Sequence, residues 1–334
     1  MKLQDLPPKA ARLCLAVERF VLRELEFAPG GRELVLAYSG GADSKALFFI
    51  LLALRPRLGC SLALAHLDHG LRDSSARELA EARALAAEYG LACHARRVEV
   101  AAKGTERKLG TEEAGRLARQ EFFAELLAED ERRWIATGHQ LNDLAEDQLM
   151  RLMRGAGWPA LGGMAGLDAQ RRLLRPILLT PRAELENFLG RLEQDWVRDP
   201  LNEDPAYLRN RVRADILPLF LRENPAFLKN AADLWRLARY DAEYFESASR
   251  PATPAGPLER DFLSALPRAA RLRAYKQKLE QLGPGQPLLR NLLALDQAWL
   301  AGRDGKQVQF PGGKSAVSRQ GGVEFLPPCP PAKL

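Results

Sequence analysis

The stretch Leu34-Val-Leu-Ala-Tyr-Ser-Gly-Gly-Ala-Asp-Ser-Lys-Ala-Leu47 combines a predicted strand, a tight turn and the start of a helix. Residues 34–38 form an apolar run of the kind found in strands that are buried on both faces. The two glycines allow the backbone to turn sharply and to approach a ligand closely. The first amides of the helix lack intrahelical partners and lie at the positive end of its dipole. The stretch therefore predicts a phosphate-binding turn.

Other interpretations of this turn are weaker. It has neither the Gly-Lys-Ser/Thr ending of a Walker loop nor the three-glycine dinucleotide fingerprint. An ordinary Gly-Gly turn capped by Asp43 or Ser44 would explain the local structure without a ligand. Lys45 stands where the helix dipole disfavours a cation. Contact with a phosphate and exposure to solvent both explain this lysine, and the sequence does not decide between them.

Predicted strands and helices alternate through the first half of the chain. This alternation predicts a doubly wound α/β fold with a parallel, Rossmann-like sheet, in which the ligand lies beyond the carboxyl ends of the strands. The polar stretches 39–44, 66–72 and 138–143 each follow a predicted strand, so we expect them to meet in one site. The segment 102–110 is polar, has two glycines and is expected to be a loop. Besides 34–38, strands are expected at 61–67, 91–100 and 134–137, and helices at 74–89, 111–129 and 142–153.

Titratable side chains stand at two of these strand ends. Asp143 and Glu146 lie three residues apart on a predicted helix and therefore share one face. Such a pair could hold an ammonium group or Mg²⁺, or could be a solvated helix face. The stretch His66-Leu-Asp-His69 offers three metal ligands without an identifiable fourth, which disfavours zinc. A role beside a nucleotide and a purely structural turn both remain open for it. A lone histidine after a strand, such as His139, is more often a structural residue than a functional one.

The composition is that of a globular protein with a basic second half. The 334 residues carry a formal net charge of +6, and residues 205–280 hold 14 Lys/Arg against 9 Asp/Glu. This excess favours a polyanionic partner such as nucleic acid, although solvated arginine-rich helices also occur without one. The sequence shows no signal-peptide core and no apolar run long enough to span a membrane, so a cytoplasmic protein is expected. The four cysteines are scattered, which indicates neither a zinc site nor a redox pair.

Several motifs follow one another in an order that is typical of one protein family. The chain resembles the tRNA(Ile)-lysidine synthetases, a family of PP-loop ATP pyrophosphatases. The resemblance covers roughly residues 34–218. It rests on Ser39-Gly-Gly-x-Asp-Ser44, on 66–72, on Glu113 with Arg116 and Arg119, on 138–146, on Arg154-Gly-Ala-Gly157, on Leu174-Arg-Pro-Ile177, on Asp199-Pro-x-Asn202 and on Arg209-Asn-Arg-x-Arg213.

The resemblance implies an activity. Members of this family use ATP to adenylate O2 of the wobble cytidine in a tRNA anticodon, releasing pyrophosphate, and the ε-amine of lysine then displaces AMP at C2. It therefore implies ATP and Mg²⁺ as cofactors. The expected partners are L-lysine and tRNA(Ile) with a CAU anticodon, without a membrane. Whether the protein is a homodimer is left open by the sequence.

The same resemblance implies roles for individual residues. It places the nucleotide and its Mg²⁺ on Asp43, and the substrate lysine on Asp143 and Glu146. A catalytic arginine near the ATP phosphates is placed on Arg116, with Arg119 as the second choice. Binding of tRNA is expected from Arg209, Arg211 and Arg213. The residues implied in ATP binding are Ser39, Gly40, Gly41, Ala42, Asp43, Ser44, Lys45, His66, Arg119 and His139.

Three positions depart from the family's pattern, and they bear on the expected lysine pocket. Asn142 precedes Asp143 where many relatives have two consecutive aspartates. Asp147 stands where a threonine is usual, and Gln120 where an aromatic residue is usual. Asp43, Asp143 and Glu146 are all present, so these departures affect the expected geometry of the pocket and not its acidic groups.

Two domains are expected from length and pattern. Residues 1–215 are predicted to form the PP-loop ATP-binding and catalytic domain, and residues 216–334 a smaller, mostly helical, tRNA-contacting domain with short terminal strands. One alternative function is a PP-loop tRNA thiolase, which would need cysteines near the site. Cys60 and Cys93 lie at predicted strand starts, away from it. Another alternative is a catalytically silent tRNA-binding relative, which the intact Asp43 and Asp143 disfavour.

Overall fold

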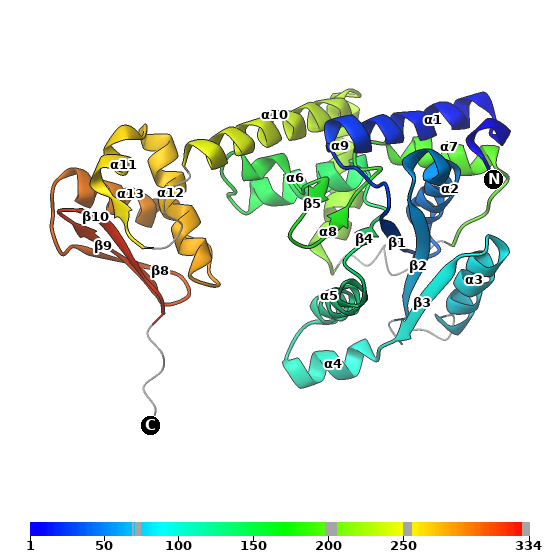
Figure 1. Ribbon diagram of the computed structural model, residues 1–334, viewed down its shortest axis with the longest axis horizontal. Coiled ribbons are helices and arrows are strands. Elements are labelled where there is room, and N and C mark those ends of the chain that lie inside the picture. Colours follow the sequence, from blue (N-terminus) through cyan, green and yellow to red (C-terminus); the bar gives the residue numbers. More distant parts are fainter. Residues whose placement is uncertain (69, 71–74, 198–205, 250–255, 329–334) are drawn as a thin grey trace. The chain divides into compact units, whose positions relative to one another are not determined.

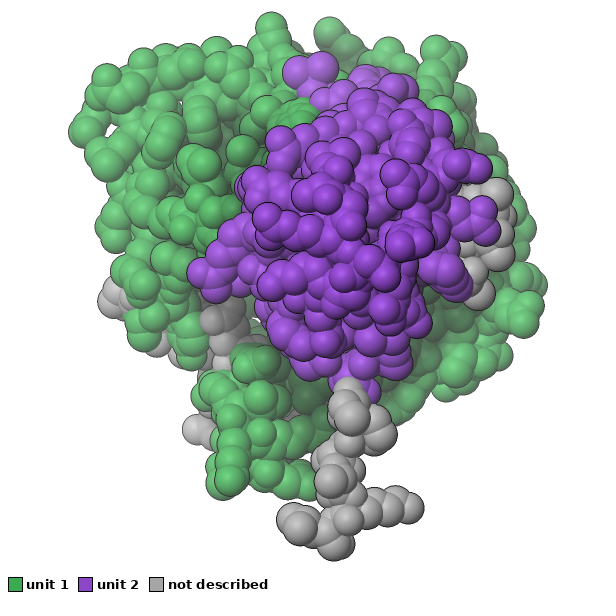
Figure 2. Space-filling view, turned by 90° about the vertical axis from the view of Figure 1, so that its left-hand side faces the viewer, with its two compact units in different colours: residues 1–236 green, residues 237–334 purple. Residues whose placement is uncertain are grey.

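The computed structural model describes residues 1–68, 70, 75–197, 206–249 and 256–328. The chain forms two compact units, Met1–Arg236 and Leu237–Leu334, which Figure 2 shows in different colours. Each unit has its own sheet and its own apolar core. None of the helices within these ranges is long and apolar enough to cross a membrane.

The first unit is built on a six-stranded sheet with the order β3-β2-β1-β4-β6-β5 (Figure 1). The central strand β1 pairs in parallel with β2 on one side and with β4 on the other. All other pairings are parallel except that of β5 with β6. The predicted doubly wound α/β fold is therefore confirmed. The strands are β1 (Glu33–Ala37), β2 (Ser61–Asp68), β3 (Ala92–Arg97), β4 (Arg133–Ala136), β5 (Leu167–Asp168) and β6 (Leu173–Leu174).

Helices cover both faces of this sheet. Leu34 and Leu36 of β1 belong to a core shared with helix α2 (Ala42–Leu58), in which residues 46–54 are all buried. Val35 points to the opposite face, where Phe122 and Leu126 of helix α5 (Thr111–Glu129) pack. The alternation follows from the two-residue period of a strand. An apolar run without any polar face, as in β1 and α2, is thus explained by burial between two layers.

The remaining helices of this unit surround the sheet, and one of them corrects a prediction. The segment 102–110, expected to be a loop, lies largely in helix α4 (Val100–Arg107). Val100 is fully buried against Ala114 and Ala118 of α5, so tertiary packing overrides the weak helix propensity of Gly104. The others are η1 (Leu3–Asp5), α1 (Pro8–Arg19), the π-helix η2 (Phe20–Glu24), α3 (Ser75–Glu88), α6 (Leu141–Met153), η3 (Ala160–Gly162), α7 (Arg182–Arg191), α8 (Leu208–Arg211), the π-helix η5 (Val212–Ile216), α9 (Leu217–Glu223) and α10 (Phe227–Ala248).

The second unit packs helices against an antiparallel sheet with the order β7-β10-β9-β8. Its core includes Tyr275 and Leu295, both fully buried. Lys314 is also fully buried, and its ammonium group donates to the carbonyl oxygens of Leu279, Gly283 and Gly285 at 2.8–2.9 Å. Such pairing is what a buried cation requires. The elements are β7 (Leu258–Glu259), α11 (Arg260–Ala265), α12 (Arg268–Gln281), α13 (Leu289–Leu300), β8 (Gln307–Phe310), β9 (Lys314–Arg319) and β10 (Gly322–Leu326).

The two compact units divide later in the chain than the predicted domains. The sequence places the boundary between residues 215 and 216, whereas the units meet between Arg236 and Leu237, inside α10. The intervening helices share a core with α6, in which Leu217 and Ala231 pack with Ala145 and Leu149. Residues 217–236 therefore complete the first unit, and α10 continues into the second.

Candidate active site

The predicted phosphate-binding turn joins β1 to α2. Gly40 has a φ of +78°, a left-handed conformation that glycine adopts without strain. The hydroxyl of Ser44 accepts the backbone N–H of Ser39 at 3.2 Å and donates to the carbonyl of Gly41 at 3.0 Å. The helix starts at Ala42 without a side-chain cap. Its first amides are therefore left for a ligand, as an anion site requires.

Asp43, on the first turn of α2, is an unusual carboxylate. Its Oδ1 atom is buried and has no hydrogen-bond partner among the described residues. Burial, followed by the nearby charge of Asp143, raises the pKa of Asp43 to about 6, while Arg182 and Arg213 act in the opposite direction. A buried carboxylate that lacks a donor is suited to a cation. The Asp43 carboxylate would therefore fit an Mg²⁺ as one of its oxygen ligands.

Lys45 does not point freely into solvent. Its ammonium group donates a hydrogen bond to the carbonyl oxygen of Asp195. Close by, the backbone N–H of Val197 donates to the carbonyl of Gly40 at 3.2 Å. The segment 195–197 therefore lies against the loop, and Lys45 helps to hold it there. A contact of Lys45 with ATP stays a prediction.

The carboxyl end of β4 lies directly against the same loop. A Cβ atom on Gly138 would be 3.1 Å from the backbone carbon of Asp43 and from the backbone nitrogen of Ser44. A methyl group at this position would push on backbone atoms, which have little freedom to move. The predicted convergence of 39–44 and 138–143 is therefore visible as a close contact that favours glycine at position 138.

This contact gives a testable expectation. Gly138→Ala should displace the loop and weaken ATP binding about 10-fold, since overpacking typically costs 1–3 kcal/mol and 1.4 kcal/mol is tenfold in affinity. Gly190→Ala on α7, where a Cβ meets nothing within 4 Å, is the matched control and should leave ATP affinity unchanged. Equilibrium binding of labelled ATP would measure both, and equal affinity in the two variants would contradict the close approach.

The end of β2 contributes buried polar atoms. Nδ1 of His66 lies 3.0 Å from the carbonyl oxygen of Tyr38, while its Nε2 has no hydrogen-bond partner in the described chain. Asp68 accepts the backbone N–H of Gly70 at 2.8 Å with one oxygen, and its other oxygen has no hydrogen bond there. His69 lies outside the described residues. No group of three His, Cys, Asp or Glu side chains that could hold a metal occurs within the described ranges.

The predicted acidic pair is present on α6, but it is not empty. Asp143 and Glu146 are 7% and 1% exposed. Arg209 donates to Asp143 at 2.8 Å and to Glu146 at 3.0 Å. Arg213 donates to Asp143 at 3.0 Å and to the two oxygens of Glu146 at 2.7 and 3.0 Å. Two guanidinium groups thus neutralise the two buried carboxylates.

The three arginines predicted to bind tRNA therefore differ in position. Arg209 and Arg213 are four residues apart and face the acidic pair, as their spacing on a helix permits. Arg211 lies between them in sequence, is exposed, and donates to the carbonyl of Ala206 at 2.9 Å. The long-range partners of Arg209 and Arg213 were missed because helix spacing shows which side chains share a face and not what they meet.

Histidine and arginine side chains adjoin the acidic pair. His139 is hydrogen-bonded through Nδ1 to the hydroxyl of Thr137 at 2.8 Å. Burial lowers the pKa of His139 to about 4 against the opposing charge of Asp143, so its ring is neutral at pH 7. Desolvation and then the charge of Arg209 lower the pKa of Arg119. Arg119 is exposed, and its side chain has no ion pair among the described residues.

Arg116 precedes Arg119 by three residues on α5. It is exposed and stands 3.8 Å from Glu113, one turn earlier on the same helix. The charge of Arg209 contributes to the lowered pKa of Arg119, and the charge of Arg119 contributes to the lowered pKa of His139. Which of the two arginines serves the ATP phosphates stays a prediction.

Comparisons with known proteins show which family this chain resembles. A model of the PP-loop domain family matches residues 16–220. A tRNA(Ile)-lysidine synthase of Nitratidesulfovibrio vulgaris is 45% identical, over 87% of this chain and 91% of the relative. The chain belongs to the tRNA(Ile)-lysidine synthase family. A second synthase of this name, from Salinispora arenicola, is 35% identical over 98% of each chain.

The structural likeness reaches beyond the lysidine synthase family. A U34-tRNA thiolase from Methanococcus maripaludis aligns with a TM-score of 0.55 and 16% identity, over 70% of this chain and 79% of that chain. At this identity the likeness shows a shared fold. The two chains thus share the PP-loop architecture, on which different chemistry can be carried.

The departures from the lysidine synthase pattern have identifiable contacts. Asn142 accepts the backbone N–H of Arg182 at 3.1 Å through its side chain, which joins the start of α6 to the start of α7. Asp147 pairs with Arg151 at 2.8 Å, one turn along α6. Gln120 is exposed on α5. None of these contacts involves Asp43, Asp143 or Glu146.

Proposed function

We propose that this chain joins L-lysine to C2 of the wobble cytidine in the CAU anticodon of tRNA(Ile), converting ATP to AMP and pyrophosphate. The buried Asp143–Glu146 pair, placed beside the phosphate-binding loop, is the observation that carries the proposal. This arrangement places an acidic site for a cationic substrate next to a nucleotide site. Membership of the tRNA(Ile)-lysidine synthase family supports the same activity.

The loop would hold ATP for the first half-reaction. Free amides at the start of α2 and the Arg119 side chain would bind the phosphates, and O2 of the cytidine would attack the α-phosphorus. Pyrophosphate then leaves, and the cytidine carries AMP. Mg²⁺ on Asp43 would neutralise charge that develops on the phosphates. The neutral ring of His139 adds no positive charge of its own at pH 7.

The acidic pair would hold the ε-amine of lysine for the second half-reaction. The ammonium would lose a proton to a carboxylate of the pair, and the amine would then attack C2. As the C2–N bond forms, the C2–O2 bond breaks and AMP leaves with O2. In the structure, the oxygens that would accept the ammonium are bonded to Arg209 and Arg213. We propose that the ammonium replaces a guanidinium, and that the released arginine then meets a phosphate of the tRNA. Arg211 is exposed, so it can contact tRNA without this exchange.

The exchange predicts a gain of lysine binding. Arg213→Gln removes three charge-assisted hydrogen bonds from the acidic pair. Since one such bond contributes about 1.5–3 kcal/mol, affinity for lysine without tRNA should rise about 10-fold or more. Labelled lysine and a non-hydrolysable ATP analogue would measure it. The control is Arg151→Gln, because Arg151 pairs with Asp147, one turn away on the same helix. Unchanged lysine affinity in Arg213→Gln would contradict the exchange.

The cysteines offer no support for the thiolase alternative. Cys60 precedes β2 and Cys93 lies within β3, both partly buried. Burial raises the pKa of Cys60 to about 11, which disfavours the reactive thiolate. Cys14 is buried in the apolar core, and Cys329 lies outside the described residues. The described thiols therefore lack the activation that sulfur transfer requires.

One experiment tests the proposed class of reaction. The protein is incubated with ATP labelled in the α-phosphate and with an unmodified tRNA(Ile) transcript that has a CAU anticodon. We expect AMP and pyrophosphate to form only when the transcript is present. Formation of ADP, or AMP formation that is independent of tRNA, would contradict the proposal.

A further inference from the structure

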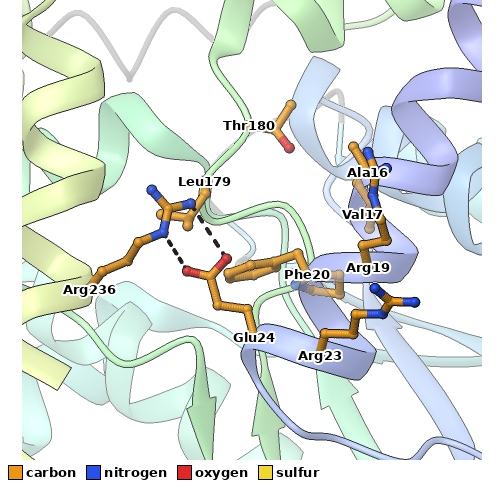
Figure 3. A pocket seen from close by; sticks show the side chains of 10 residues that line it. Ala16, Val17, Arg19, Phe20, Arg23, Glu24, Leu179, Thr180 and Arg236 are labelled. Carbon is orange, nitrogen blue, oxygen red and sulfur yellow. Dashed lines mark hydrogen bonds and ion pairs between the residues drawn. The ribbon is translucent and has the colours of Figure 1, made fainter. Parts of the chain in front are cut away.

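A cavity of about 370 Å³ lies in the first unit, away from the phosphate-binding loop. Its walls are the end of α1, the π-helix η2, the segment 176–180 and the first half of α10 (Figure 3). Phe20 and Leu179 supply apolar surface, and Arg19, Arg23, Glu24 and Arg236 supply charge. The residues of the loop and of the acidic pair do not line it. The cavity is therefore separate from the proposed active site.

The charges around this cavity are unbalanced. Arg236 is paired with Glu24, as the dashed lines in Figure 3 show, and its Nε lies 2.6 Å from Oε1 of Glu24. Arg236 also bonds to Asp233 at 3.0 Å. Arg19 and Arg23 are exposed and have no ion pair or hydrogen bond through their side chains within the described ranges. The one carboxylate of the lining is thus taken, and two guanidinium groups remain without an anion.

The backbone at this cavity is irregular. α1 gives way at Phe20 to a π-helix that ends at Glu24. Such π segments are rare and occur frequently at functional sites, because the wider turn re-aims side chains. Here the change brings four nearly consecutive side chains, from Arg19 to Glu24, to the lining of one cavity. The two free arginines lie four residues apart within this stretch.

The opposite wall is connected to the helix that carries the acidic pair. Thr180 lines the cavity, and its carbonyl oxygen accepts the backbone N–H of Leu141 at 3.0 Å. Arg182 follows, and its N–H is bound by the side chain of Asn142 at 3.1 Å. A ligand in the cavity would therefore touch the segment that anchors the first turn of α6.

We infer that this cavity binds a phosphodiester of the tRNA backbone, as a second contact of the first unit with its substrate. The inference rests on the proposed function for the identity of the RNA. Guanidinium groups bind phosphate oxygens through paired, directional hydrogen bonds. Two free arginines suit singly charged phosphodiesters, and the apolar surface of Phe20 and Leu179 suits a sugar beside them. The chain's basic excess is consistent with a polyanionic ligand.

The test is tRNA binding by the full chain carrying Arg19→Gln and Arg23→Gln together. Affinity is measured without ATP at several salt concentrations. We expect a loss of about 10-fold or more and a shallower salt dependence, by about one to two in the log–log slope, because fewer counterions are released. The rate of AMP formation at saturating tRNA should stay unchanged, whereas the KM for tRNA rises. Arg12→Gln, an exposed arginine of α1 that does not line the cavity, is the control.

The other outcomes are also informative. A double variant that binds tRNA with the affinity and salt slope of Arg12→Gln would overturn the inference. A titration with inorganic pyrophosphate separates the two sources of phosphate. If the double change abolishes a pyrophosphate site but leaves tRNA binding intact, the cavity takes a small phosphate and the RNA contact is overturned. If the unchanged protein binds tRNA but forms no AMP, the proposed function fails while the cavity result stands on its own.

Discussion

Replacing Glu146 by glutamine should separate the two half-reactions. The side chain keeps its shape but loses the charge that would hold the lysine ammonium. A charge-assisted hydrogen bond contributes about 1.5–3 kcal/mol, so the lysine concentration required for transfer should rise about 10- to 100-fold. Adenylation precedes lysine attack, so pyrophosphate release on tRNA should survive much better. Pyrophosphate release and lysine transfer are measured separately on the same preparation.

The control for this change lies next to it on the same helix. Asp147 carries the same type of group but pairs with Arg151, one turn further along α6. Asp147→Asn should leave the lysine dependence unchanged. Because Glu146 accepts hydrogen bonds from two arginines, thermal unfolding of Glu146→Gln should be compared with that of the unchanged protein. If both half-reactions fall in parallel, or if the lysine dependence does not move, the acidic pair is not the lysine site.

Asp43→Ala should abolish most of the first half-reaction. We expect AMP formation to fall about 10²-fold or more, because the change removes the group proposed to position Mg²⁺ at the phosphates. Asp43→Asn, which keeps the size of the side chain, should be nearly as inactive. Measurement of pyrophosphate release at saturating ATP and tRNA tests this. Full activity of Asp43→Asn would show that only the shape of the side chain matters.

Folding stability should change in the opposite direction. The pKa of Asp43 is raised to about 6 in the folded protein, so the folded state holds the proton more tightly than the unfolded chain. At pH 7 the ionised carboxylate therefore lowers stability, and a neutral asparagine should leave the melting temperature equal or higher. A substitution that lowers activity and raises stability is typical of a side chain that is retained for function.

Much of the fold could be predicted from local pattern. Residues 34–38 and 46–54 are apolar on every side, and both lie between layers of the first unit. Polar stretches after the strands are expected to converge, and the close approach of Gly138 to Asp43 shows this for 39–44 and 138–143. These two inferences need only the periodicity of neighbouring residues and the rule that ligands bind at the carboxyl ends of parallel strands. Both can be applied to a sequence.

The rest depends on contacts that the sequence does not display. Helix α4 forms although Gly104 lowers its helix propensity, because Val100 packs against helix α5. Arg209 and Arg213 were expected to meet RNA, yet their guanidinium groups bind carboxylates of α6. A basic cluster shows a need for anions, and the protein itself supplies them here. The same carboxylates are expected from the sequence to bind lysine. Both predictions therefore depend on the proposed exchange of a guanidinium group for the lysine ammonium.

The proposed reaction attaches lysine to the wobble cytidine. The most direct measurement is to incubate the protein with ATP, L-lysine and the tRNA(Ile) transcript, digest the RNA to nucleosides and identify them by mass. We expect that one cytidine per tRNA is replaced by a lysine-bearing nucleoside, with one AMP formed for each. A transcript with uridine at the wobble position should stay unmodified. A thiolated nucleoside, or an unmodified cytidine despite AMP formation, would contradict the account.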